Sequence, residues 1–442
     1  MDFDVLFIGS GHGSDGATLL AQKGWKVGMI EKDLFGGTCT NRGCNAKITL
    51  ERLPELKRNV ENLIGKGVHD TFELDWTSIM AHKHKVIDGL NLQVKGKFEA
   101  SGITTIIGNA KFIDPHTIQV DGKEIYTSEK IVIATGCTPN QLQLPGSEHF
   151  IDSTDFMLLE NLPTNVTIIG GGFIAMEFAC ILQSLGRLVQ VLLRGDKALK
   201  GFYQPHVEAL LKNMEEKGIS IFRNTQVSSA KKEHDKFSLT LQNGEILQTD
   251  MVLDATGRNP NIEGLGLETI GVDFSKDGIL VDEYLETTVP GIFATGDVIA
   301  KSVPKITPIA TFESFYLAKS FLNGKEKIEY PPFAQAVFST PRIAQAGLSI
   351  ATALENPEAY TLKEVDYVKE DWFHQVSNEP FNQLCLIYDT ANKLVGVANI
   401  GSDAVETVNG MLHALGEGIH GKKPEDILYI FPSISHAYKK HL

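Results

Sequence analysis

The chain has 442 residues, a formal net charge of −14 and a hydrophobic share of 42%, which fits a globular protein. This length exceeds what one hydrophobic core organises, so two or three domains are expected. The acidic balance excludes nucleic-acid binding as the main task, because that affinity comes from clustered Lys and Arg. No apolar run reaches the ~18 residues of a membrane span, and no secretion leader precedes the first strand, so we expect no membrane partner and a cytoplasmic location.

Five cysteines are spread over the chain: Cys39, Cys44, Cys137, Cys180 and Cys385. An odd, scattered set does not form a disulfide framework. In a reducing compartment, paired cysteines are usually catalytic or metal-binding. Zinc requires further ligands at tight spacing, and His12 and His69 stand alone, whereas His82 and His84 lie among lysines on what reads as a solvated helix face. We therefore expect no metal site.

The N-terminal segment has the pattern of a dinucleotide-binding unit. An apolar strand over 3–8 leads into Gly9-Ser10-Gly11, a helical pattern follows, and a second strand over 27–30 ends in Glu31. Glycines let the backbone approach a pyrophosphate, and the acid accepts hydrogen bonds from a ribose. The third fingerprint position is Ser14 rather than glycine, which we expect to loosen the helix slightly against the strand. The alternative is a simple tight turn.

A second unit of the same kind begins at the apolar strand 166–169. Its three fingerprint positions are complete: Gly170, Gly172 and Ala175. The following strand, 190–193, ends not in an acid but in Arg194, with Lys197 and Lys200 behind it. Because cations can clamp a ribose 2′-phosphate that an acid would repel, this unit is predicted to bind NADPH. The alternative is a basic surface loop.

Further apolar strands end in small residues. The strand 131–133 stops at Ala134-Thr135-Gly136, the strand 251–255 precedes Gly257, and the strand 292–294 is followed by Gly296 and Asp297. An acid at such a strand end can bind ribityl or ribose hydroxyls, although alone it would be a turn aspartate. We place a domain crossing near 145–150. From about residue 330, separate strands (337–338, 384–388, 394–400) and helices (404–420) predict a third domain.

The stretch 36–47 holds Cys39 and Cys44 behind a glycine pair. On a helix the two sulfurs would lie little more than one turn apart, so a disulfide could close if the first cysteine sits at a distorted start. A disulfide that closes almost no loop contributes little stability. The pair therefore points to redox chemistry.

Taken in order, these motifs resemble the pyridine nucleotide-disulfide oxidoreductases over nearly the whole chain. The likeness is closest to the branch of glutathione reductase, dihydrolipoamide dehydrogenase and mercuric reductase, and residues 36–39 and 41–44 carry it most specifically. It implies an α/β fold with two Rossmann-like domains and a C-terminal α+β dimerisation domain. The implied bounds are 1–147 and 263–330 for FAD binding, 148–262 for NAD(P) binding and 331–442 for dimerisation. It also implies a C2 homodimer in which residues near Phe431 approach the partner's Cys39.

The resemblance assigns roles position by position. FAD would be held by Gly9, Gly11, Glu31, Thr38, Thr135, Gly136 and Asp297, and NADPH by Gly170, Gly172, Ala175, Arg194 and Lys200. Further cofactor-binding positions are Ser14, Lys32, Ala134, Gly257 and Gly296. Cys44 would be the thiolate against the flavin, and Cys39 the exposed sulfur that attacks substrate. Lys47 would meet Glu177 beside the flavin N5, where a cation stabilises the reduced flavin; the alternative is a helix surface charge.

Three departures from the family pattern bear on the substrate. Members that reduce bulky disulfides carry a C-terminal histidine, with a glutamate five residues on, as the acid and base; here Phe431 and His436 stand at these places. Leu19 replaces the substrate-binding arginine of glutathione reductases, and no cysteine pair follows Cys385 as in mercuric reductases. Phe431 cannot donate a proton to a basic leaving thiolate.

A small oxidant with a weakly basic leaving group needs no such acid. Hypothiocyanous acid fits, because thiocyanate leaves readily, and the sequence also resembles bacterial members of the family assigned to reduce it in oxidative stress defence. Three other readings remain open. The first is reduction of a low-molecular-weight disulfide with His436 as the acid, the second is an NADPH:flavin reductase of quinones or metal ions, and the third is a non-catalytic redox sensor.

Overall fold

The computed structural model describes residues 1–415 and 428–441, and the chain divides into two compact units. The first comprises Met1–Lys47, Ala81–Asn140 and Gly257–Tyr330, and the second Ile48–Met80, Gln141–Thr256 and Pro331–Leu442. The predicted α/β class is confirmed, with parallel sheets in both units. Within the described ranges, no helix is both long and apolar enough to cross a membrane.

The first unit is built on a sheet whose parallel strands run in the order β3-β2-β1-β6, with β18 parallel to β6 on the other side. Strands β1 and β2 are almost continuously buried, as expected for a parallel sheet covered on both faces. Strand β6 continues into the antiparallel pair β5 and β4. The strands are β1 (Phe3–Ile8), β2 (Val27–Glu31), β3 (Thr104–Ile107), β4 (Ala110–Asp114), β5 (Thr117–Val120), β6 (Glu124–Ile133), β7 (Cys137–Pro139), β15 (Arg258–Pro260), β16 (Phe274–Ser275), β17 (Gly278–Ile279) and β18 (Ile292–Ala294).

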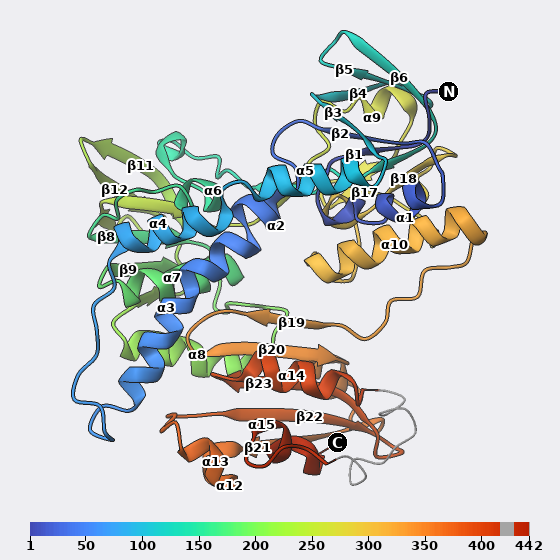
Figure 1. Cartoon of the computed structure of the whole chain (residues 1–442). Coiled ribbons are helices and arrows are strands. Elements are labelled where there is room, and N and C mark those ends of the chain that lie inside the picture. Colours follow the sequence, from blue (N-terminus) through green and yellow to red (C-terminus); the bar gives the residue numbers. More distant parts are fainter. Residues whose placement is uncertain (416–427, 442) are drawn as a thin grey trace. The chain divides into compact units, whose positions relative to one another are not determined.

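Helix α10 organises the loops of this unit. It packs on α1 (Figure 1) and on the short helices η1 and η3. At Gly16, a Cβ would lie 2.2 Å from the backbone oxygen of Ser314 in α10, so this close packing requires glycine. The helices of the unit are η1 (His12–Ser14), α1 (Ala17–Gln22), α2 (Gly37–Arg42), α5 (Leu90–Ala100), α9 (Leu267–Ile270), η3 (Gly296–Val298) and α10 (Thr307–Asn323); α3 (Cys44–Asn62) begins in it and α4 (Trp76–Ile87) ends in it.

Ser14 does not act as a spacer in place of the third glycine. It is buried in η1, and its hydroxyl donates to the carbonyl of Gly9 across the turn at 2.7 Å. The tight approach of the first helix is made two residues later, at Gly16, whose amide also donates to the Ser314 hydroxyl at 2.9 Å. The turn is therefore closed by a side-chain hydrogen bond where the fingerprint has a glycine.

The second unit contains a parallel sheet in the order β10-β9-β8-β14 and an antiparallel meander β11-β12-β13. Helix α7 is buried along most of its length, which fits its apolar sequence. The elements are η2 (Ser147–His149), α6 (Ser153–Phe156), β8 (Asn165–Ile169), α7 (Phe173–Ser184), β9 (Leu188–Leu192), α8 (Gln204–Glu216), β10 (Ser220–Phe222), β11 (Val227–Glu233), β12 (Lys236–Leu241), β13 (Ile246–Thr249) and β14 (Met251–Asp254).

The same unit holds the C-terminal antiparallel sheet, ordered β19-β20-β23-β22-β21, with α14 packed on β20 and β23 (Figure 1). The strands expected from the sequence lie here. The helix expected over 404–420 is shorter in the structure: α14 ends at Leu412, residues 413–415 form a turn, and residues 416–420 lie outside the described ranges. The elements are β19 (Ala334–Val337), β20 (Arg342–Gly347), α11 (Ile350–Glu355), β21 (Tyr360–Asp366), α12 (Tyr367–Glu370), α13 (Trp372–Gln375), β22 (Gln383–Asp389), β23 (Leu394–Gly401), α14 (Ala404–Leu412), α15 (Ile434–Tyr438) and η5 (Lys439–His441).

Candidate active site

A break between two helices brings Cys39 and Cys44 together. Cys39 lies in α2 and Cys44 begins α3, with Gly43 between them at φ −133° and ψ −118°. A Cβ on Gly43 would lie 2.8 Å from the carbonyl oxygen of Thr38, so a larger residue would push the two helices apart. The distortion that a cysteine pair at this spacing needs is therefore located at Gly43.

The two cysteines are free thiols whose sulfurs both approach Thr307, the first residue of α10. The Thr307 Oγ1 lies 3.4 Å from the Cys39 Sγ and 3.6 Å from the Cys44 Sγ. The hydrogen bond from Cys39, followed by Thr307 and the charge of Lys47, lowers the pKa of Cys44 to about 6 against the opposing effect of burial. The same Cys44 partner and burial raise the pKa of Cys39. The pair therefore carries one proton near neutrality, with the thiolate on Cys44.

Lys47 and Glu177 belong to different units. Lys47 lies in the first turn of α3, and its charge acts on Cys44 within the first unit. Glu177 lies in α7 of the second unit, where it is buried and accepts a hydrogen bond from the Phe338 amide at 2.8 Å. The expected pairing of these two side chains stays a prediction.

The first glycine turn leaves open space at one of its glycines. A Cβ on Gly9, where φ is +101°, would lie 2.4 Å from the carbonyl oxygen of Ala134, so the turn is seated on the end of β6. At Gly11, by contrast, a Cβ would meet nothing nearer than the Gly37 Cα at 4.0 Å. A bare backbone edge with open space in front of it fits the diphosphate of a dinucleotide such as FAD.

Glu31, at the end of β2, is held by the turn. Its Oε2 accepts hydrogen bonds from the Ser10 amide at 3.0 Å and from the Ser10 hydroxyl at 2.7 Å. The same hydroxyl accepts from the Gly36 amide at 3.0 Å, which ties the cysteine segment to the turn. The carboxylate is thus fixed where the sequence predicts a ribose acid, while Lys32 and Thr38 are exposed.

The strand-end turns of the first unit meet the same loop. The Thr295 hydroxyl donates to the Gly13 carbonyl at 2.7 Å, and the Gly296 amide donates to Glu313 of α10 at 2.7 Å. Lys301 pairs with the buried Glu313 at 2.8 Å. The structure therefore gathers Gly9, Gly11, Ser14, Glu31, Ala134 and Gly296 around one loop cluster.

Asp297 and Thr135 are held by neighbours that the sequence did not single out. The Asp297 Oδ2 accepts a hydrogen bond from the Cys137 thiol at 3.4 Å, and Arg258 Nε donates to the Cys137 Sγ at 3.0 Å. The Thr135 hydroxyl donates to the backbone carbonyl of Asn261 at 2.7 Å, and the Asn261 Nδ2 donates to the backbone carbonyl of Thr135 at 2.8 Å. Cys137 thus links Arg258 to the predicted ribityl acid, while Gly136 and Gly257 supply backbone at positive φ.

The second glycine turn shows the same combination of close and open positions. A Cβ on Gly170, where φ is +140°, would lie 2.2 Å from the carbonyl oxygen of Ala255, whereas nothing lies within 4 Å at Gly172. The Leu199 amide donates to the Gly171 carbonyl at 2.8 Å, so the basic loop is bonded to the turn. Arg194 and Lys200 on this loop are exposed, and Ala175 is fully buried in α7. The turn and loop fit a nucleotide phosphate.

Phe431 and His436 lie side by side near the C-terminus. Phe431 is 63% exposed, and its ring centroid lies 4.9 Å from that of His436 in an edge-to-face arrangement. The His436 amide is capped by the Ser433 hydroxyl at 3.1 Å, which fixes the start of α15. An exposed aromatic ring thus occupies position 431, where the family resemblance leads us to expect the acid and base.

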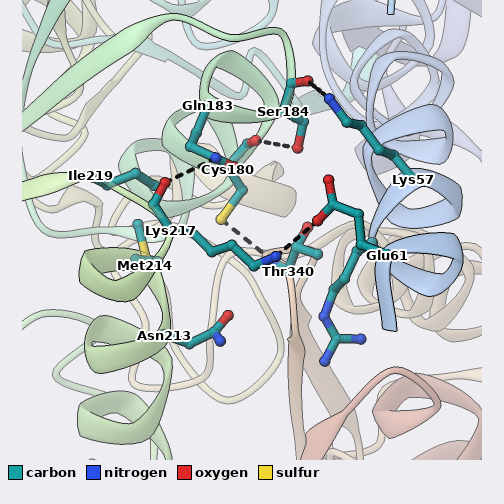
Figure 2. Close-up of a pocket in the computed structure, with 11 residues that line it drawn as sticks. Lys57, Glu61, Cys180, Gln183, Ser184, Asn213, Met214, Lys217, Ile219 and Thr340 are labelled. Carbon is teal, nitrogen blue, oxygen red and sulfur yellow. Dashed lines mark hydrogen bonds and ion pairs between the residues drawn. The ribbon is translucent and has the colours of Figure 1, made fainter. Parts of the chain in front are cut away.

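A cavity of about 40 Å³ in the second unit holds none of the predicted site residues (Figure 2). Lys57 Nζ donates to the carbonyl of Ser184, the last residue of α7, at 2.9 Å, and Lys217 pairs with Glu61 at 2.8 Å. Cations that bond the last carbonyls of a helix stabilise its C-terminus. We interpret the cavity as space beside a capped helix end, and no cluster of metal-ligating side chains is found in the described ranges.

Sequence reasoning missed several residues that hold the site. Thr307 lies 268 positions from Cys39, so no local pattern connects them, although proline after threonine marks a helix start. Glu313, Arg258 and Cys137 stand in no local pattern that predicts a role at this site. His12 was set aside as an isolated histidine. Each of these residues acts through a tertiary contact.

Comparisons with known proteins agree with this geometry. The family model described as pyridine nucleotide-disulphide oxidoreductase matches residues 3–314. The chain is 32% identical to a glutathione reductase of Nostoc sp. over 99% of this chain and 98% of the relative. It is 33% identical to a glutathione reductase of Burkholderia cepacia over 94% of this chain and 92% of that relative. It is also 33% identical to a mercuric reductase of Staphylococcus aureus over 80% of this chain and 66% of that relative. Glutathione reductases use FAD and NADPH, the two cofactors predicted from the sequence. The chain belongs to the pyridine nucleotide-disulphide oxidoreductase family.

Proposed function

We propose that this enzyme uses NADPH and FAD to reduce a small thiol-reactive oxidant, hypothiocyanous acid, at Cys39 and Cys44. One observation carries the proposal: two free cysteines whose sulfurs meet at Thr307, in a chain whose expected acid and base position is the exposed Phe431. The pair supplies a nucleophile and a resolving thiolate, but Phe431 supplies no proton to a leaving group.

The cofactor sites follow from the two turns. FAD would be held by the loop cluster of the first unit, with Glu31 and Asp297 toward its hydroxyls, and NADPH by the turn at Gly172 with Arg194 and Lys200 toward its 2′-phosphate. FAD held there would supply the two-electron chemistry that links NADPH to the Cys39–Cys44 disulfide. The exposed cations beside the second turn support NADPH over NADH.

The chemistry at the sulfurs balances with the cysteine pair's own proton, so no acid at position 431 is needed. The Cys44 thiolate takes the proton of the Cys39 thiol, and the Cys39 sulfur attacks the sulfur of hypothiocyanous acid. Hydroxide departs and receives that proton from Cys44, leaving as water. The Cys44 thiolate then attacks the Cys39 sulfur, closes the disulfide and expels thiocyanate. Two thiol electrons are transferred, and one water and one thiocyanate are formed.

Phe431 would act from the second subunit of a homodimer. In the proposed C2 arrangement, this ring faces the partner's Cys39 and forms an apolar wall of the substrate pocket. Such a wall excludes water from a small uncharged oxidant and offers nothing to the carboxylates of glutathione. Sedimentation should therefore give a dimer, and a fully active monomer would contradict this arrangement.

The test is NADPH oxidation by the FAD-loaded enzyme with hypothiocyanous acid, oxidised glutathione, lipoamide and a quinone side by side. We expect kcat/KM for hypothiocyanous acid to exceed the others by at least about a hundredfold. Cys39→Ser should abolish this turnover, with Cys385→Ser, a buried cysteine outside the site, as the matched control. Equal rates with oxidised glutathione would overturn the substrate, and turnover that survives Cys39→Ser would indicate a flavin reductase.

A second candidate is reduction of a low-molecular-weight disulfide. It is supported by the 4.9 Å between the rings of Phe431 and His436, which puts an imidazole beside the expected acid position, and by the two glutathione reductases among the relatives. In that case His436→Ala should reduce turnover of the disulfide by a hundredfold or more, as removal of a general acid does. An unchanged rate in His436→Ala excludes this role.

A further inference from the structure

The first glycine turn carries a histidine whose ring is fixed by a carboxylate. The His12 Nδ1 lies 2.9 Å from the Asp15 Oδ2, and the Thr311 hydroxyl of α10 donates to the same oxygen at 2.7 Å. Because a carboxylate only accepts hydrogen bonds, Nδ1 must be the protonated nitrogen. The Nε2 is then the nitrogen that a ligand can meet, and 35% of the side chain is exposed.

The surroundings favour the imidazolium. The hydrogen bond to Asp15, the charge of Asp15 and that of Cys44 raise the pKa of His12, although burial opposes them. Helix η1 packs on α10 and η3, and these elements contribute charges of both signs. The charged residues of these two elements are Glu313, which is paired with Lys301, together with Lys319 and Asp297.

An anion at this turn meets no other cation from the N-terminal segment. The first Lys or Arg of the chain is Lys23, beyond the end of α1. Asp15, by contrast, adds a negative charge 2.9 Å from the His12 ring, in the same loop as the open position at Gly11. Without a proton on His12, Asp15 would repel a diphosphate there, and the neutral ring would present the lone pair of Nε2 to it.

We propose that the His12 imidazolium, held in place by Asp15 and Thr311, binds the diphosphate of FAD and makes FAD retention weaken as the pH rises. This inference rests on the proposed function, in which this turn holds FAD. His12 then binds the cofactor directly. Asp15 sets the orientation of the His12 ring and the pH at which the imidazolium loses the proton that binds the diphosphate. Below that pH, Nε2–H donates to a phosphate oxygen; above it, the donor is gone.

The test measures FAD binding to the full-length apoprotein by quenching of flavin fluorescence between about pH 6 and pH 9. A charge-assisted hydrogen bond predicts that the Kd of the unmodified protein rises about tenfold over this range. His12→Gln keeps a donor but no charge, so its Kd should be about tenfold higher at pH 6 and constant with pH. His149→Gln, an exposed histidine of the second unit, is the matched control and should follow the unmodified protein.

Asp15→Asn gives a second measurement in which His12 is retained. Without the carboxylate, the midpoint of the Kd profile should move to lower pH, and FAD should bind more tightly than to the unmodified protein at pH 9. A flat profile in the unmodified protein, or His12→Gln with unmodified Kd and profile, overturns the inference while FAD binding itself stands. An apoprotein that binds no FAD at any pH overturns the proposed function as well.

Discussion

Replacement of Cys39 by alanine tests whether the thiolate of Cys44 is stabilised by its neighbour. The first cause of the lowered pKa of Cys44, about 6, is the hydrogen bond from Cys39, and Thr307 and Lys47 contribute less. A hydrogen bond to a charged acceptor that is partly exposed contributes about 1.4 kcal/mol, or about one pKa unit. The pKa of Cys44 in Cys39→Ala should therefore rise to about 7, and the thiolate fraction at pH 7 should fall from about nine-tenths to about half.

The measurement is a pH titration of thiolate absorbance in the ultraviolet, together with the rate of alkylation of Cys44 by iodoacetamide. Both should follow the same midpoint, because only the thiolate absorbs and reacts. Cys180→Ala, which removes a thiol of the second unit whose burial raises its pKa to about 12, is the control and should leave the midpoint unchanged. An unchanged midpoint in Cys39→Ala would show that Lys47 and Thr307 suffice.

Two further predictions concern buried charges. Glu313→Gln leaves Lys301 buried without its partner, so the free energy of unfolding from urea titration should fall by about 3 kcal/mol, and Lys301→Met in the same chain should recover part of that loss. Burial, followed by the charge of Glu379, raises the pKa of Asp403 to about 6, whereas the pKa of Asp in an unfolded chain is ~3.9. The folded protein therefore binds this proton more tightly than the unfolded chain does. The stabilisation that the proton provides is complete below about pH 4 and is lost as the pH rises through 6. Asp403→Asn should flatten that decline and stabilise the protein at pH 7 by about 1 kcal/mol; a decline that persists would assign it to another group.

The fold was predictable because its signals are local. Strands of continuous apolar residues, glycine turns and strand-end acids follow one another within short windows, and β1, β8 and β18 lie where these windows place them. The domain bounds that the family resemblance implies stay a prediction. The position of the close helix packing was not predictable, because the requirement for glycine at Gly16 depends on the backbone of Ser314, about 300 residues away.

The candidate cysteine pair could be selected from the sequence, but the residue that contacts both sulfurs could not, and the catalytic roles of the pair stay predictions. The spacing of Cys39 and Cys44 behind a glycine pair identifies them as candidates. Thr307 contacts both sulfurs, but no motif in the sequence marks this threonine. His12 illustrates the same limit. Its role depends on Asp15 being held by Thr311, and neither the residue type nor its spacing signals that arrangement.

Helix α10 connects these tuning contacts along one element. The Thr307 hydroxyl contacts the cysteine sulfurs, and the Thr311 hydroxyl donates to the Asp15 carboxylate. Glu313 accepts a hydrogen bond from the Gly296 amide, and the Ser314 hydroxyl accepts one from the Gly16 amide. Residues four apart on a helix lie on one face, so Thr307 and Thr311 are stacked one turn apart. A shift of α10 along its axis would therefore move two hydroxyls together: that of Thr307 at the cysteine sulfurs and that of Thr311 at the Asp15 carboxylate. Because one helix supplies both hydroxyls, a substitution in α10 that displaces Thr311 from Asp15 should also alter the contact of Thr307 with Cys39 and Cys44.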